Sequence, residues 1–379
     1  MRRRIQNLKL KRMTINRSLS KTFGVTHNSI INFISIIRPS SHNCFVSQLS
    51  LSPCQYYTAT KSISKSHLTP ANISFGGSLI SIFNGTIPRL LTSPSQTRLI
   101  SSSTMSSKLI PSNPSDVAVI RTVTPNVVTV SVPFARFGII RVGGRGTIIR
   151  LTSGTLAVFS PVALTPETQA KISELGGNVG YIIAGDIEHH IFISEWARAY
   201  PGAKIVGPKG LAEKRAKVRD DPKIGHEAFA FEWTAANHAS NAVSDEFAAD
   251  FDVEYVDAHP NKEVVLFYKP DRVLVQADLM FNLPATEQYS RVPEAQKRSH
   301  GFLNRVFESL NSTGGEAKGI KRFQWYVASG KDRAGFNECV RRIAAWDFDS
   351  IIPCHGETVV GGGKELFNKV FEWHLQGHK

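Results

Sequence analysis

The chain has 379 residues, of which 41% are hydrophobic, enough for one domain of about 200–250 residues with a packed core and a further segment. The net charge of +14 comes from the N-terminal part, because the first 115 residues hold 14 of the 45 Lys and Arg and none of the 31 Asp and Glu. The rest therefore carries 31 basic and 31 acidic residues, which removes the electrostatic argument for a nucleic-acid partner.

Residues 1–107 are predicted to be a basic leader. They are rich in Ser, Thr, Asn and Arg, contain no acid and begin with Met1-Arg-Arg-Arg, which is typical of an organellar transit segment. A disordered tail, or an upstream extension of the reading frame with Met105 as the true start, fits the same composition. The first interpretation predicts a mitochondrial protein and the others a cytoplasmic one. Apolar runs such as residues 30–37 are far shorter than the ~20 residues of a membrane span, so we expect no membrane partner.

The domain, residues 108–379, is predicted to begin as a series of short antiparallel strands. Its β-branched runs are separated by turns that contain glycine, and we expect Gly143-Gly144-Arg145-Gly146 to break the strand pattern. The predicted strands cover residues 127–132, 138–142, 147–151 and 155–159.

Further along the chain, strands alternate with helices. Thr165 is a suitable N-cap, Pro166 suits the first helical position and Gly176 ends the segment, so we expect a helix between them. The other predicted helices cover residues 191–200, 209–218, 301–310, 335–346 and 364–375. The predicted strands cover residues 181–184, 204–207, 252–256, 263–268, 273–277 and 350–353, and residues 219–250 and 282–332 are less regular. This alternation indicates an α/β layered fold and not a helical bundle.

Histidines and carboxylates follow several of the apolar runs. Side chains of these two types that converge from strand ends are the ligands a divalent metal ion requires, whereas a single histidine at a strand end is more often structural. The candidate metal ligands are Asp186, Glu188, His189, His190, His259, Asp278 and His355.

Three of these segments resemble the metallo-β-lactamase superfamily. Pro353-Cys-His355-Gly is similar to the strand-end segment that carries the family's last histidine, and Ala277-Asp278-Leu-Met-Phe to the one with its bridging aspartate. His259-Pro-Asn-Lys-Glu-Val-Val is similar to the segment with its middle histidine. Over residues 125–375 the resemblance implies an αββα sandwich of two mixed sheets flanked by helices, with the metal site at one edge.

The chain departs from the family's chief motif, His-x-His-x-Asp-His. One register puts Glu188-His189 at the Asp-His positions, with Asp186 in place of the second histidine; the other puts His189-His190 there. Counting from the strand end at Ala184 favours the second register, and neither keeps the His-x-His pair. The chain therefore resembles a divergent, uncharacterised branch of the superfamily, a domain of unknown function.

The resemblance implies a metal-dependent hydrolase whose metal-bound hydroxide attacks an ester, lactone, thioester or phosphoester in a small-molecule substrate. His355, one of His189 and His190, and Asp278 would hold zinc, or else iron or manganese, and Asp278 would also orient or deprotonate the water. His259 would bind a second ion or donate a hydrogen bond. Two alternatives stay open: a non-catalytic binding protein with a degenerate metal site, and a redox protein with a carboxylate-rich di-iron site.

Overall fold

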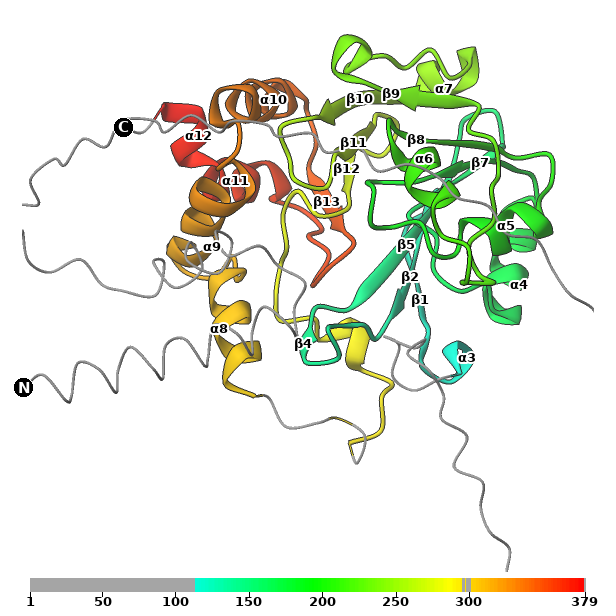
Figure 1. The fold of residues 1–379 in the computed structure, drawn as a ribbon, viewed down its shortest axis with the longest axis horizontal. Coiled ribbons are helices and arrows are strands. Elements are labelled where there is room, and N and C mark those ends of the chain that lie inside the picture. The colour runs from blue at the N-terminus through cyan, green and yellow to red at the C-terminus, as the bar shows by residue number, and fades with distance from the viewer. Residues whose placement is uncertain (1–112, 295–296, 298–300, 378–379) are drawn as a thin grey trace, which may run out of the picture. The chain divides into compact units, whose positions relative to one another are not determined.

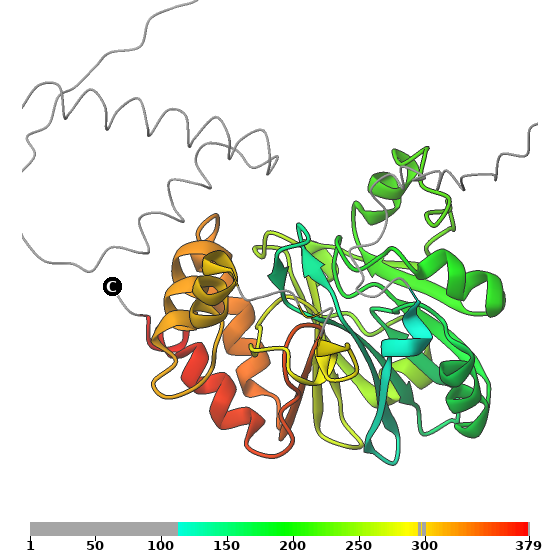
Figure 2. The same cartoon turned by 90° about the horizontal axis from the view of Figure 1, so that it is seen from below.

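The computed structural model describes residues 113–294, 297 and 301–377. The predicted leader, residues 1–107, lies outside the described residues. Within the described part, two mixed β-sheets pack face to face and each is covered by helices on its outer side (Figure 1). Figure 2 shows the same layers from below, with α10 and α11 beyond one sheet and α4 and α5 beyond the other. The observed architecture is the αββα sandwich that the metallo-β-lactamase resemblance implies.

The first sheet has seven strands in the order β1-β2-β5-β6-β7-β8-β9. Neighbours from β1 to β6 are antiparallel, and those from β6 to β9 are parallel. Its strands are β1 Val119–Thr124, β2 Val127–Val132, β5 Gly144–Arg150, β6 Leu156–Phe159, β7 Val179–Ile183, β8 Lys204–Pro208 and β9 Phe231–Trp233. A separate two-stranded ribbon joins β3 Ala135–Arg136 to β4 Ile140–Arg141.

The second sheet has four strands in chain order: β10 Phe251–Val256, β11 Glu263–Tyr268, β12 Val273–Gln276 and β13 Ser350–Pro353. β12 and β13 are parallel neighbours, and Gln276 lies opposite Pro353 in their register. Since both strands end at the same sheet edge, the residues two positions further along, Asp278 and His355, leave the sheet side by side.

Residues of both sheets alternate between the two faces of each strand, as the twofold period of a strand requires. On β11, Val264 and Leu266 point into the core between the sheets, whereas Val265 and Phe267 pack against the outer helices. On β6, Phe159 faces the inner core and Val158 the opposite helical layer. Burial on both faces explains why these strands are nearly continuous apolar runs in the sequence. Each such side chain contributes about 1.5–3 kcal/mol on burial.

Helices cover the outer face of each sheet. Thr165 accepts a hydrogen bond from the backbone N–H of Thr168 and Pro166 is the first residue of α4, as predicted. No helix of the described residues is both long and apolar enough to cross a membrane. The helices are α3 Pro114–Val117, α4 Pro166–Glu174, α5 Ile193–Ala199, α6 Leu211–Ala216, α7 Asp245–Asp250, α8 Phe302–Leu310, α9 Lys318–Phe323, α10 Arg333–Ala345, α11 Gly363–Val370 and α12 Glu372–Gln376, with shorter turns at η1 Ala235–Asn237, η2 Glu287–Tyr289 and η4 Gln324–Ala328.

Three sequence predictions differ from the structure. The expected break at Gly143-Gly144-Arg145-Gly146 is wrong, because Gly144 begins β5 and pairs with β2. A side chain at Gly146 would lie 3.2 Å from the backbone oxygen of Ser160, so this glycine serves close packing and not a turn. β9 and α7 lie within residues 219–250, which the sequence predicts to be less regular. The helix predicted at residues 364–375 is divided at Phe371 into α11 and α12. By contrast, β11 and β13 have their predicted bounds.

Candidate metal centre

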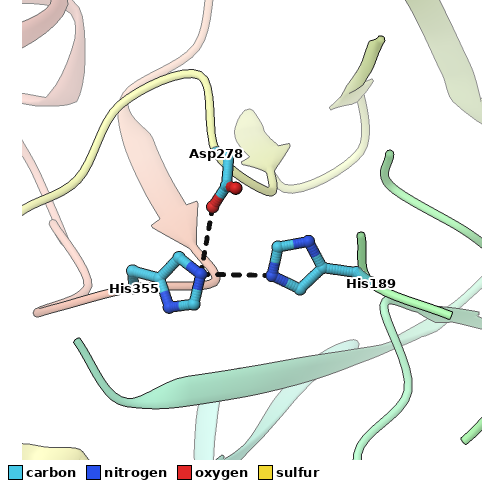
Figure 3. Close-up of side chains that lie close together, drawn as sticks. All are labelled: His189, Asp278 and His355. Carbon is cyan, nitrogen blue, oxygen red and sulfur yellow. Dashed lines mark hydrogen bonds and ion pairs between the residues drawn. The ribbon is translucent and has the colours of Figure 1, made fainter. Parts of the chain in front are cut away.

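Three side chains from distant parts of the sequence converge beyond the ends of three strands. His189 lies in the loop after β7, Asp278 follows β12 and His355 follows β13 (Figure 3). The Nε2 atoms of His189 and His355 are 3.2 Å apart, and His355 Nε2 is 3.0 Å from Asp278 Oδ1. One ligand atom from each residue lies within 4.8 Å of the other two, close enough for all three to reach one ion.

The other ring nitrogen of each histidine is already used. His355 Nδ1 donates to the backbone oxygen of Gly143 at 2.6 Å, and His189 Nδ1 donates to Asp186 Oδ1 at 2.9 Å. Because a carbonyl and a carboxylate only accept, both Nδ1 atoms carry a hydrogen, and the two Nε2 atoms are left facing each other beside a carboxylate oxygen. Either a proton shared between the two Nε2 atoms or a metal ion can occupy this position. This arrangement, with a hydrogen-bonded partner behind each imidazole, is typical of metal-binding histidines.

Asp186 stands behind His189. Its side chain is fully buried, and its Oδ1 also accepts the backbone N–H groups of Glu188 and His189, both at 2.7 Å. These bonds form the turn that aims the His189 ring at the group of three. Among the described residues its Oδ2, which is buried, has no hydrogen-bond partner. The structure therefore places Asp186 as the support of a candidate ligand.

The charges around the three side chains favour a cation at their centre. Burial alone would raise the pKa of Asp278, but His355 and His189 hold that pKa below its usual range. Burial opposes a charge on His189 too, yet Asp186 and Asp278 outweigh it and raise the pKa of His189 to about 10. Without metal, the group thus holds a proton on His189. Two imidazole nitrogens and a carboxylate oxygen suit zinc and equally iron or manganese, so the residues present fit a divalent ion.

The second oxygen of Asp278 and its backbone are also fixed. Asn261 Nδ2 donates to Asp278 Oδ2 at 2.6 Å. The buried carboxylate of Glu263 accepts the backbone N–H groups of Ala277 and Asp278 at 2.6 and 2.9 Å. Burial, followed by the charges of Asp186 and Asp278, raises the pKa of Glu263. Asp278 Oδ1 is left without a hydrogen-bond donor, and it faces the two imidazoles.

Two buried side chains hold the backbone on both sides of His355. Arg145 Nη1 donates to the carbonyl oxygens of Pro353 and Gly356, both at 2.7 Å. Gln288 Nε2 donates to the carbonyl oxygen of Cys354 at 2.9 Å, and Gln288 Oε1 accepts the N–H of Gly356 at 3.0 Å. Sequence reasoning missed both residues. No local pattern marks either residue, because their partners lie between 66 and 211 residues away in the chain.

The other predicted ligands lie outside this group. His190 points to Arg215, whose Nη1 is 3.4 Å from its Nδ1, and burial followed by Lys214 and Arg215 lowers the pKa of His190 to about 4. Glu188 pairs with Lys214 at 2.7 Å. His259 is buried and its Nδ1 accepts the backbone N–H of Asn261 at 3.3 Å. His189, and not His190, therefore lies in the group of three.

A cavity of about 270 Å³ adjoins the group of three, and His189 and His355 form part of its wall. The remaining wall comes from β2 with the β3–β4 ribbon, the start of β5, the turn after β6 and the loop before α5. A small molecule in this cavity would therefore lie against the imidazole pair.

Comparison with known proteins gives a family match over less than half of the chain. Residues 136–305 match the model of a domain of unknown function, DUF4336, which includes His189 and Asp278 but not His355. The search of curated proteins gave no match.

Solved structures with a similar fold include three proteins of low sequence identity. A metallo-β-lactamase from Pontibacter korlensis shares 11% identity over 68% of this chain and 98% of its own, with a TM-score of 0.43. One from Hirschia baltica shares 12% over 67% and 96%, also at 0.43. The Flv1 flavodiiron core of Synechocystis sp. shares 11% over 68% and 60%, at 0.45. Residues 136–305 thus match the DUF4336 model, and the described residues form the two-sheet αββα fold that the metallo-β-lactamase resemblance implied.

Proposed function

We propose that the protein is a metal-dependent hydrolase that cleaves an ester, lactone, thioester or phosphoester in a small molecule. The observation that supports this proposal is the convergence of His189 Nε2, His355 Nε2 and Asp278 Oδ1, with the Nδ1 atom of each histidine already used as a donor. Three protein ligands with a free position beside a cavity are typical of a catalytic site.

A divalent ion bound here would supply Lewis acidity and lower the pKa of water to about 7. The chain's own residues supply orientation. Asn261 holds Asp278 Oδ2, so only Oδ1 faces the imidazoles, and it can accept a hydrogen bond from the attacking water. Asp186 and the Gly143 carbonyl keep the rings of His189 and His355 in place, so little reorganisation is needed when substrate binds.

Metal content tests this proposal. The full chain, purified after growth with zinc, iron and manganese, should retain about one equivalent of metal by elemental analysis. Asp278→Asn and His355→Gln should lose it, whereas His226→Gln, a histidine outside the group, should keep it. The parent and His226→Gln should then hydrolyse nitrophenyl esters, thioesters or phosphodiesters in a metal-dependent manner.

A non-catalytic binding protein is the second candidate. The observation in its favour is that the segment after β7 supplies one ligand histidine where the family motif has three. If the parent retained no metal although circular dichroism showed a folded protein that melts cooperatively, the hydrolase proposal would fail. The binding function would then be the better account of the fold.

A further inference from the structure

The cavity beside the candidate metal centre has an uneven distribution of charge. Its wall includes Glu188, but Lys214 Nζ pairs with that carboxylate at 2.7 Å. It also includes Arg145, whose guanidinium is bound by the carbonyls of Pro353 and Gly356 and by Glu287. Both charged side chains therefore already have partners within the chain.

Arg136 is the exception. It lies at the end of β3, partly exposed, and it lines the same cavity as His189 and His355. Within the described part of the chain no carboxylate comes within ion-pair distance of its guanidinium, which lies 5.4 Å from the centre of the Phe137 ring. A cation–π contact of this kind orients the guanidinium and leaves its N–H donors available. A planar guanidinium with available donors binds carboxylate and phosphate groups well.

The rest of this wall is largely apolar. Phe134, Ile191 and Phe192 contribute to it, and Phe137 stands at the tip of the ribbon with 48% of its surface exposed. The backbone of Phe137 has φ +55°, a left-handed conformation that costs a non-glycine residue about 1–2 kcal/mol. The ribbon therefore presents an exposed aromatic ring and a cation to the cavity.

We propose that the cavity selects a small substrate with an anionic group, carboxylate or phosphate, which binds the Arg136 guanidinium while an apolar part packs against Phe134 and Phe192. The cavity volume of about 270 Å³ is close to the lower end of the ~300–1,000 Å³ range of small-molecule sites. That such a molecule is also cleaved rests on the proposed hydrolase function. The recognition by Arg136 does not rest on it, because it needs no metal.

Binding of matched ligands to the full chain tests the proposal. The probes are 3-phenylpropionate with 3-phenylpropanamide, which have nearly the same shape, and phenyl phosphate with phenol, which lacks the phosphate group. Their binding is measured by titration calorimetry on metal-loaded and metal-depleted protein. Each anion should bind more tightly than its neutral partner. Arg136→Gln should weaken the anions about tenfold, as expected for loss of a charged hydrogen bond, and leave the neutral partners unchanged. The carboxylate and phosphate pairs show which anion the site prefers.

Two further variants control the result. Arg136→Lys keeps the charge and should recover part of the preference. Arg322→Gln removes an exposed arginine on α9, which does not line the cavity, and should change neither ligand. Equal affinities within each pair, or a preference that Arg136→Gln leaves intact, would overturn the proposal. A preference that persists in metal-depleted protein would support the proposal even if the hydrolase function failed. Metal-dependent hydrolysis without any preference for the anions would remove only this inference.

Discussion

His355 and His374 are both buried, at 4% and 0% exposure, and they lie in opposite surroundings. His355 has the Gly143 carbonyl on one ring nitrogen, and His189 and Asp278 on the other. His374, on α12, packs against the rings of Trp325 and Phe336, with the Ser329 hydroxyl 3.2 Å from its Nε2.

The difference shows what converts a buried histidine into a candidate ligand. Burial alone keeps an imidazole neutral, and for His374 burial, followed by Arg333, lowers the pKa to about 4. Carboxylates reverse this effect at His189, whose pKa rises to about 10. A nearby carboxylate together with a fixed Nδ1 tautomer thus distinguishes the candidate metal centre from a structural histidine.

The largest expected effect comes from removing the support of His355. Arg145→Met should destabilise the protein by about 3–5 kcal/mol, because it leaves Glu287 and the carbonyls of Pro353 and Gly356 without their buried partner. Arg121→Met is the matched control, since Arg121 pairs with the same Glu287 from a position whose side chain is 38% exposed. Urea unfolding of both variants measures the difference. Equal losses of stability would contradict the role given to Arg145.

The second effect concerns His374 and depends on pH. Its pKa is lower in the folded protein than the ordinary value of 6.5, so its contribution to stability is intact above pH 6.5 and falls as pH drops towards 4. This one residue should cost about 3 kcal/mol of stability by pH 4. His374→Leu should reduce the pH slope of the unfolding free energy, while His226→Leu should not. The slope should not vanish, because His190 also has a lowered pKa.

The third effect concerns the support of His189. Asp186→Asn should lower metal affinity about 10–100-fold, because it removes the negative charge behind His189 that makes the ring a stronger metal ligand. The loop should keep its fold, since an amide oxygen can still accept the backbone N–H groups of Glu188 and His189. Competition with a chelator measures the affinity. Unchanged affinity would show that His189 does not hold the ion.

The strand ends that carry two of the three converging residues could be predicted from the sequence. β11, β12 and β13 are apolar runs with clear limits, so the pattern of residues alone puts Asp278 and His355 just beyond the ends of strands. β9 was missed because three residues, Phe231–Trp233, are too few to show a period.

The choice between His189 and His190 could not be made from the sequence. It depends on the turn that Asp186 forms by accepting two backbone N–H groups, which rotates one imidazole towards Asp278 and the other towards Arg215. Arg145 was missed for a different reason. Its partners lie 208 and 211 residues away, and no local pattern encodes such a contact.

The smallest expected effect is the difference in stability between alanine substitutions at Gly143 and at Gly138. Gly143 and Gly138 have nearly equal φ values, +71° and +72°, so alanine at either costs about 1 kcal/mol from the backbone alone. A Cβ at Gly138 meets nothing, whereas one at Gly143 would lie 2.2 Å from Gln288 Oε1. Gly143→Ala should therefore cost about 1–3 kcal/mol more than Gly138→Ala, because Gln288 has to move.

The same two variants also test the candidate metal centre. Gln288 bonds the backbone beside His355, and the Gly143 carbonyl accepts the hydrogen of His355 Nδ1. Gly143→Ala should thus weaken metal binding while Gly138→Ala leaves it unchanged, and thermal melting with and without metal measures both effects. If the two variants lost stability equally and bound metal equally, Gly143 would be an ordinary turn glycine and His355 would take its orientation from elsewhere.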